Sequence, residues 1–155
     1  DFGNAFSVFV AQNFGAEKTD RIRQGIRSAL LSVLAFCVVI STVVFALAGP
    51  LMRIFVDESS VEVVAVGVQY LRIEGAFYLG IGILFLLYGY YRAVNKPLMS
   101  VMLTVVSLGT RVLLAYVLSG RDSIGVVGIW AAIPIGWFLA DAVGIGYYMK
   151  KEQLR

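Results

Sequence analysis

The stretch SALLSVLAFCVVISTVVFALAG, Ser28 to Gly49, decides the fold class, because it carries no charge from Ala29 to Ala48. A helix of that length covers about 30 Å at 1.5 Å per residue, which is the thickness of the hydrocarbon core of a bilayer. Of all 155 residues, 59% are hydrophobic and only 15% are charged, whereas about a quarter are charged in a soluble domain. One small core cannot bury so much apolar surface, so we predict an integral membrane protein.

Other apolar segments follow, and together they predict an all-α fold, a polytopic bundle of transmembrane helices. We expect one partial and four complete spans, at residues 2–14 (the partial one), 29–48, 73–91, 98–118 and 126–149. The partial segment is too short to cross a bilayer alone, since a span needs about 20 residues. The connections RAVNKP and SGRDSIG are short, so the helices that they join should be antiparallel neighbours.

Glycine, proline and serine residues predict where individual helices begin and end. Gly15 suits the position just after a helix, where glycine readily adopts a left-handed backbone conformation. The pair Gly49-Pro50 should end the second helix, because proline cannot continue the hydrogen-bond ladder. Ser59 and Glu62 have the spacing of a capping box, which predicts a helix start.

The lysines and arginines predict how the bundle is oriented, because loops rich in these residues face the cytoplasm. With alternate loops on opposite sides, one side carries most of them: Lys18, Arg21, Arg23, Arg27, Arg92, Lys96, Lys150, Lys151 and Arg155. The other side carries Arg53, Arg72 and Arg121. We therefore expect a multi-pass protein of a bacterial-type inner or plasma membrane with its C-terminus in the cytoplasm.

The composition argues against several chemistries. There is no histidine, and the only cysteine is Cys37 within an apolar run, so neither a disulfide framework nor a catalytic thiol nor a His-ligated metal is expected. An intramembrane enzyme would need a Ser–His pair or two carboxylates at one depth, and the pattern offers neither. The bases do not cluster with exposed aromatics, so nucleic acid is not an expected partner. We predict no enzyme activity and no bound cofactor.

The last span, 126–149, has two faces of different character. On one face, small residues recur every four positions and let two helix backbones approach closely, which indicates tight packing. These residues are Gly128, Ala132, Gly136, Ala140 and Gly144. The other face carries Trp130, Pro134 and Trp137, and Pro134 should bend the helix. Such a bend fits either a cavity wall in a transporter or a simple packing kink beside an interfacial tryptophan.

Two predicted spans contain charged residues in their interior. Asp141 lies about 12 Å inside the cytoplasmic boundary, so it should face protein or water, as a packing partner or as part of a transport path. In the preceding span a polar stripe leads to Arg111 through Ser100, Thr104 and Ser107. The stripe fits either an aqueous cavity or interhelical hydrogen bonds.

Helix depth predicts the partner of Arg111. Counting from the connecting loop places Arg111 at the level of Ala132, about 12 Å from the level of Asp141, which argues against a pair between them. Glu74, expected near the outer end of the 73–91 helix, is the better candidate.

Tyr70, Glu74 and Tyr78 share one helix face. Tyrosine rings beside a carboxylate suit an organic cation, through π contact and charge together. An aromatic belt at the membrane interface with a snorkelling glutamate explains the pattern at least as well.

The order of these features resembles the C-terminal part of a MATE (multidrug and toxic compound extrusion) transporter, with the DinF-like branch as the candidate branch. The motifs that carry the resemblance are AQNFGAEKTDRIRQG, YLRIEGAFY, YGYYRAVNKP, TRVLLAYVLS and GIWAAIPIGWFLAD. The resemblance implies a twelve-helix protein of two pseudosymmetric lobes, in which residues 1–155 form the end of helix 8 and helices 9 to 12. It also implies export of cationic amphipathic drugs and metabolites, driven by inward Na⁺ or H⁺ through alternating access.

One departure from the family bears on ion coupling. A branch of the family carries an acid midway along helix 10, where this chain has the acid-free segment GIGILFLLYG, residues 80–89. The DinF-like branch places its coupling carboxylate in the N-terminal lobe instead. We therefore expect the coupling site to lie outside this chain, and the expected partners are that N-terminal lobe, the bilayer and small organic cations.

Two other functions fit a membrane bundle. A flippase for lipid-linked oligosaccharide or peptidoglycan precursors would need several intramembrane bases to bind pyrophosphate, and this chain offers only Arg111. A small structural membrane subunit without transport activity is opposed by the first residue, Asp1 in place of methionine, and by the half-helix that follows it.

The pairing of Glu74 with Arg111 makes a testable prediction. If the two charges attract each other inside the membrane, exchanging them in the double variant Glu74→Arg with Arg111→Glu should restore activity that each single variant loses. Activity of the whole protein is compared among the four forms. The pairing is wrong if the double variant rescues neither single change.

Overall fold

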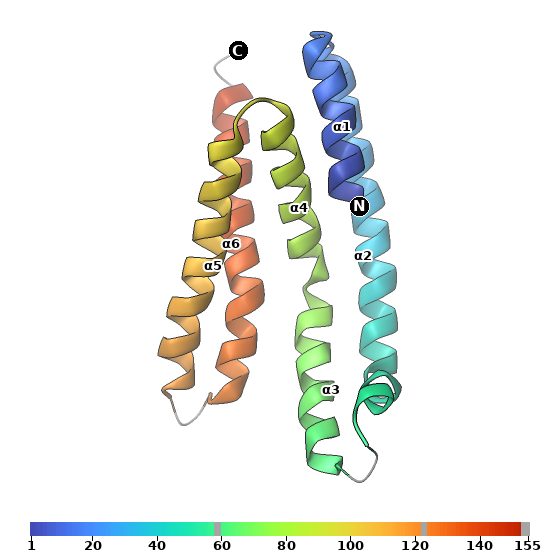
Figure 1. Cartoon of the computed structure of the whole chain (residues 1–155), viewed down its shortest axis with the longest axis vertical. Coiled ribbons are helices and arrows are strands. Elements are labelled where there is room, and N and C mark those ends of the chain that lie inside the picture. The colour runs from blue at the N-terminus through green and yellow to red at the C-terminus, as the bar shows by residue number, and fades with distance from the viewer. Residues whose placement is uncertain (58–59, 122–123, 153–155) are drawn as a thin grey trace.

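The computed structural model describes residues 1–57, 60–121 and 124–152 of the chain. Within this part the chain forms helices and no strand, so the predicted all-α fold is confirmed (Figure 1). The helices are α1 (Phe2–Gly15), α2 (Thr19–Phe55), α3 (Val61–Ala76), α4 (Tyr78–Ala93), α5 (Pro97–Ser119) and α6 (Val126–Glu152).

The helices lie side by side along the long axis of the molecule (Figure 1). The α1–α2 turn, the α4–α5 turn and the end of α6 lie at one end of the bundle, and the other two connections lie at the opposite end. Helix α4 is central, with contacts to α1, α2, α5 and α6. This grouping of the loops is the one that the charge analysis assumed, while the side that faces the cytoplasm stays a prediction.

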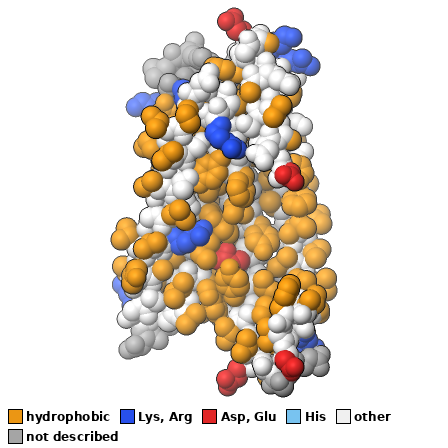
Figure 2. All heavy atoms as spheres, viewed as in Figure 1, with side chains coloured by type: hydrophobic (Ala, Val, Ile, Leu, Met, Phe, Trp, Pro, Cys, Tyr) orange, Lys and Arg blue, Asp and Glu red, His pale blue; other side chains and the backbone are white. Residues whose placement is uncertain are grey.

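Several helices are long and apolar enough to cross a bilayer. Helices α2 and α5 and residues Val126–Lys150 of α6 qualify singly, and α3 with α4 qualifies as one bent span. Hydrophobic side chains cover most of the length of the face seen in Figure 2. On α5, for example, Leu98 and Leu113 are 77% and 68% exposed, which suits contact with lipid rather than water.

Helix α2 is longer than the predicted 29–48 span and runs through Gly49-Pro50 to Phe55. The prediction that Gly49-Pro50 ends the helix is therefore wrong. A proline removes one hydrogen bond from the ladder, and membrane helices tolerate this loss when neighbouring groups compensate. At about 55 Å the helix exceeds the bilayer core, and Asp20 in its first turn and Arg53 in its last suit the helix dipole.

Helix α1 ends at Gly15, as its sequence suggests, but glycine does not make the left-handed turn. Glu17 adopts that conformation instead, with φ of 57°. The amide of Lys18 donates to the carbonyl of Asn13 at 2.9 Å, which closes the turn into α2. The predicted capping box cannot be judged in full, since Ser59 lies outside the described residues; helix α3 starts at Val61, and its N-cap Ser60 makes no side-chain cap bond.

The predicted 73–91 span differs most from the structure. Helix α3 begins much earlier, at Val61, and the chain bends by 51° between α3 and α4. Gly75 and Gly80 flank the break at Phe77, and glycine is the residue that weakens a helix most apart from proline. The thiol of Cys37 on α2 donates to the carbonyl of Tyr78 at 3.5 Å, so α2 supplies a polar contact at the break.

The small-residue face of α6 lies against α5. Ala132 and Ala140 are fully buried, and a β-carbon on Gly136 would stand 2.6 Å from the carbonyl oxygen of Ser107. A β-carbon on Gly144 would meet the side chains of Leu87 and Leu103. The two helices therefore approach so closely that glycine is required at these positions.

Gly136→Ala should destabilise the protein, because the new methyl group meets backbone rather than a movable side chain. We expect a loss of about 1–3 kcal/mol in the free energy of unfolding, seen as a lower apparent melting temperature in detergent. The matched control is Gly146→Ala on the same helix, where a β-carbon meets nothing within 4 Å. Equal effects of the two substitutions would contradict the close approach of α6 to α5.

Candidate functional site

Few polar side chains are buried in the described part of the protein, and they do not share one role. The buried polar side chains are Asn13, Glu74, Ser107 and Asp141. Asn13 donates to the carbonyl of Phe9 at 2.8 Å and completes the end of α1. In contrast, Oε1 of Glu74 and both carboxylate oxygens of Asp141 are buried with no hydrogen-bond partner among the described residues. Unpaired carboxylates inside a membrane are costly, which makes them candidates for function.

Glu74 lies at the helix break rather than at the end of a span. It is 5% exposed, in the last turn of α3, and its carbonyl accepts the amide of Phe77 at 3.1 Å. Since α3 begins at Val61, the side chain lies about 20 Å from the start of the bent span. The expectation that Glu74 lies near the outer end of its helix is therefore wrong, because the helix starts earlier than the apolar run that predicted it.

The residues Tyr70, Glu74 and Tyr78, expected on one face, do gather with Arg111. Arg111 of α5 lies within electrostatic range of both Glu74 and Tyr70, and Tyr78 lies within electrostatic range of Tyr70. The rings of Tyr70 and Trp130 meet edge to face with centroids 5.8 Å apart, which joins α6 to the group. We call these five residues the Glu74 cluster.

Pro134 leaves the backbone carbonyl of Trp130, a member of this cluster, without its usual helical donor. It is buried within α6, and it has no N–H to donate to the carbonyl of Trp130, one turn earlier. The cluster thus combines a carboxylate, phenolic hydroxyls and a carbonyl that lacks its usual helical donor. Oxygens of this kind suit hard cations, and the aromatic faces suit organic cations. In the described residues, no group of three His, Cys, Asp or Glu side chains could hold a metal ion.

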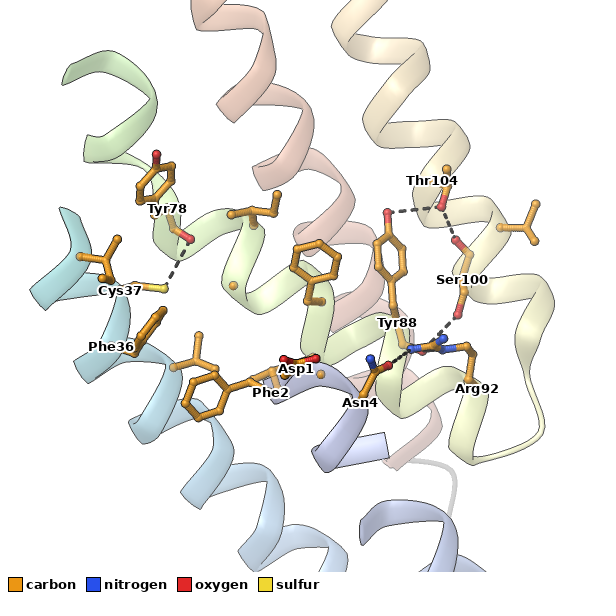
Figure 3. A pocket seen from close by; sticks show the side chains of 18 residues that line it. Asp1, Phe2, Asn4, Phe36, Cys37, Tyr78, Tyr88, Arg92, Ser100 and Thr104 are labelled. Atoms are coloured by element: carbon orange, nitrogen blue, oxygen red, sulfur yellow. Dashed lines mark hydrogen bonds between the residues drawn. The ribbon is translucent and has the colours of Figure 1, made fainter. Parts of the chain in front are cut away.

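A cavity of about 640 Å³ opens between α1, α2, α4 and α5. Figure 3 shows its aromatic side chains, which include Phe2 and Phe36, and a polar wall formed by Tyr88 and its neighbours. On that wall Thr104 donates to the hydroxyl of Tyr88 and Ser100 to its carbonyl, both at 3.3 Å. We call this cavity the α1–α4 pocket.

Tyr78 connects the α1–α4 pocket with the Glu74 cluster, since it lines the first and belongs to the second. Thr104, predicted from the polar stripe, also lines the pocket. Sequence reasoning missed Cys37, Phe85 and Tyr88 as lining residues. The sequence around these residues is apolar and gave no signal for them. Which side chains of a helix line a cavity depends on how the helices pack.

The other predicted residues lie between helices rather than in a pocket. Ser107 and Trp137 are buried, and Gly80 of α4 approaches Trp137, so both residues are part of the packed interior. Asp141 is 4% exposed, and among the described residues no charged group acts on it, Arg111 included. The structure therefore leaves Asp141 apart from Arg111, as the depth argument expected. It places Arg111 within electrostatic range of Glu74, although the outer-end position from which depth predicted this pair is wrong.

A second cavity, of about 860 Å³, lies at the end of the bundle that holds the α1–α2 turn. Four tyrosines from two helices contribute to its wall: Tyr90, Tyr91, Tyr147 and Tyr148. The Tyr91 hydroxyl donates to the carbonyl of Gly144 at 2.6 Å, and Nζ of Lys96 lies 5.5 Å from the centroid of the Tyr147 ring. The two Tyr-Tyr pairs were visible in the sequence, but only the packing of α4 on α6 brings them together.

The chain is similar in sequence to known proteins. A family model described as MatE matches residues 2–117. The chain is 26% identical over 156 residues to the probable multidrug resistance protein YoeA of Bacillus subtilis (strain 168), a match that covers 98% of this chain and 33% of that protein. The chain thus spans about a third of the length of this curated relative. No solved structure matches the chain.

Asp141→Asn tests whether the buried acid of α6 holds helices together. Since its carboxylate oxygens have no hydrogen-bond partner in the described part of the chain, the amide should leave the apparent melting temperature in detergent unchanged or raise it. The control is Asp20→Asn, an exposed change in the first turn of α2 that should alter stability by no more than about 0.5 kcal/mol. A clear loss of stability with Asp141→Asn alone would assign the acid to helix packing.

Proposed function

Because the chain belongs to the MatE family, we propose that it forms the C-terminal lobe of a two-lobe exporter of cationic amphipathic compounds, driven by Na⁺ or H⁺. The relative from Bacillus subtilis, which is about three times as long as the matched region, supports a second lobe in the whole protein. The printed name of that relative supports multidrug export. The N-terminal lobe of the same chain is the proposed partner.

The observation that carries this proposal is the burial of Glu74 at a break in a membrane span, with no hydrogen-bond partner for its Oε1 among the described residues. Transporters commonly build substrate and ion sites at discontinuous helices near the middle of the bilayer. A buried carboxylate attracts a cation there, since a bound cation relieves the cost of the isolated negative charge. Glu74 has both properties, since the residue is 5% exposed and lies in the last turn before the break.

Glu74 also changes where ion coupling is proposed. The expectation of a site outside this chain rested on the acid-free segment 80–89, taken as the middle of the span. With the bent span running from Val61 to Ala93, Glu74 occupies its middle instead. We therefore propose that Glu74 contacts a coupling ion or a cationic substrate in this lobe, whatever further site the N-terminal lobe contains.

The α1–α4 pocket is the proposed path for the substrate. Its volume, about 640 Å³, is within the range of pockets that hold drug-sized molecules. Aromatic side chains favour flat apolar cations, and Tyr78 of the pocket wall lies within electrostatic range of Tyr70 in the Glu74 cluster. The bend between α3 and α4 is the proposed hinge for alternating access. The helical hydrogen-bond ladder is interrupted there, so the angle between the two helices can change.

The alternatives are less well supported. A flippase site for a pyrophosphate group would require several bases free to bind it, whereas Arg111 lies beside an acid. A purely structural subunit would gain nothing from buried carboxylate oxygens of Glu74 and Asp141 that have no hydrogen-bond partner among the described residues, since these cost stability.

The proposal predicts that cells expressing the whole transporter export ethidium, and that export stops when the Na⁺ and H⁺ gradients are dissipated. Glu74→Gln should lower the initial export rate by at least about tenfold, the effect of losing a contact to a charged group worth about 1.5–3 kcal/mol. The matched control is Glu62→Gln, an exposed acid in the first turn of the same helix.

Export should be unchanged in the Glu62→Gln control. Export that persists without gradients would contradict the antiport mechanism. Export at the normal rate by Glu74→Gln, with normal protein levels in the membrane, would remove Glu74 from the site.

A further inference from the structure

We propose that Arg111 is an internal counter-cation for Glu74, which a transported cation must displace to reach the carboxylate. This proposal rests on the proposed function, since it assumes that Glu74 binds a cation. It assigns to α5 a role in the affinity of the site. In this view the empty site contains one negative and one positive charge, and the bound cation competes with the guanidinium.

The two side chains are close enough to act on each other without being joined. Arg111 is the charged group that acts on Glu74, and its positive charge stabilises the negative charge of the carboxylate. Its Nε is buried with no hydrogen-bond partner among the described residues, and so is Oε1 of Glu74. Two complementary buried atoms that both lack partners are unusual, because buried polar groups are normally hydrogen-bonded. The two side chains therefore attract each other, but these two atoms share no hydrogen bond.

The position of Arg111 on α5 favours the Glu74 cluster as the environment of its guanidinium. Leu108 and Val112, on either side along the helix, are exposed on the apolar surface, so a guanidinium turned that way would enter hydrocarbon. The opposite side of α5 is pressed against α6, where the Arg111 amide nitrogen would stand 3.7 Å from a β-carbon on Gly136. The cluster with Glu74 and Tyr70 is the remaining polar environment.

The loose contact between the two charges has a functional consequence. A bidentate arginine–carboxylate pair is strong and specific in geometry, and it would hold the site closed against a monovalent cation. A pair held only by electrostatic attraction compensates the buried charge of Glu74 yet leaves the carboxylate open to a competitor. The displaced guanidinium has the rings of Tyr70 and Trp130 in the same cluster, and aromatic faces accept arginine well.

The test measures binding of tetraphenylphosphonium to the purified whole transporter in detergent. Arg111→Met removes the competing charge and should tighten binding by at least about fivefold, a typical coupling between two interacting charges. The matched control is Arg72→Met on α3, two positions before Glu74, where the exposed guanidinium lies 5.2 Å from the centroid of the Phe45 ring. This variant loses the same charge outside the cluster and should bind with unchanged affinity.

The double variant distinguishes competition at Glu74 from a general effect of charge. In the Glu74→Gln background, Arg111→Met should no longer tighten binding, because no carboxylate is left to compete for. Unchanged or weaker binding by Arg111→Met, while Glu74→Gln does weaken binding, overturns the counter-cation alone. Unchanged binding and export by Glu74→Gln instead overturns the proposed function itself.

Stability provides a second measurement in case Arg111→Met does not fold. Removing one member of a buried pair leaves an uncompensated charge, whereas removing both is tolerated far better. The variant Glu74→Gln with Arg111→Met should therefore recover folded yield and melting temperature that Arg111→Met loses. A double variant as unstable as the single one would assign Arg111 to a structural role unrelated to Glu74.

Discussion

The burial of the Glu74 side chain, whose Oε1 has no hydrogen-bond partner among the described residues, is the constraint on which the rest of the candidate site depends. It needs a helix break that places it between helices, and glycines on both sides of Phe77 supply that break. It also needs a nearby positive charge, and Arg111 supplies this from α5. The electrostatic cost of one side chain thus explains features of three helices.

Close helix packing is what brings these features to one place. Glycines on α6 let its backbone approach α5, as the contact of Gly136 with the Ser107 carbonyl shows. The same packing sets Trp130 against Tyr70 and so connects α6 with the bent span. In a bilayer, helices gain little from hydrophobic burial, so such close contacts and a few polar interactions hold them together. The packing that stabilises the bundle also builds the site.

Local signals for helix ends were only partly predictive. Pro97 opens α5 as expected, because the first turn of a helix needs no amide donor there. Pro50 does not end α2, since neighbouring groups can replace one lost bond. The left-handed turn after α1 falls on Glu17 rather than on Gly15. Each rule describes a preference of about 1–3 kcal/mol, which the surrounding bundle can outweigh.

The sequence by itself determined the membrane class, the all-α fold and the candidate residues, because hydrophobic length and helical periodicity are properties of the chain alone. It also separated Arg111 from Asp141, since depth along a straight helix follows from counting residues. Only the tertiary structure decided that the helix starting at Val61 joins α4 in one span bent by 51°, which moves Glu74 from the end of a span to its middle. The bend depends on contacts between helices, and no periodicity within one helix records those contacts.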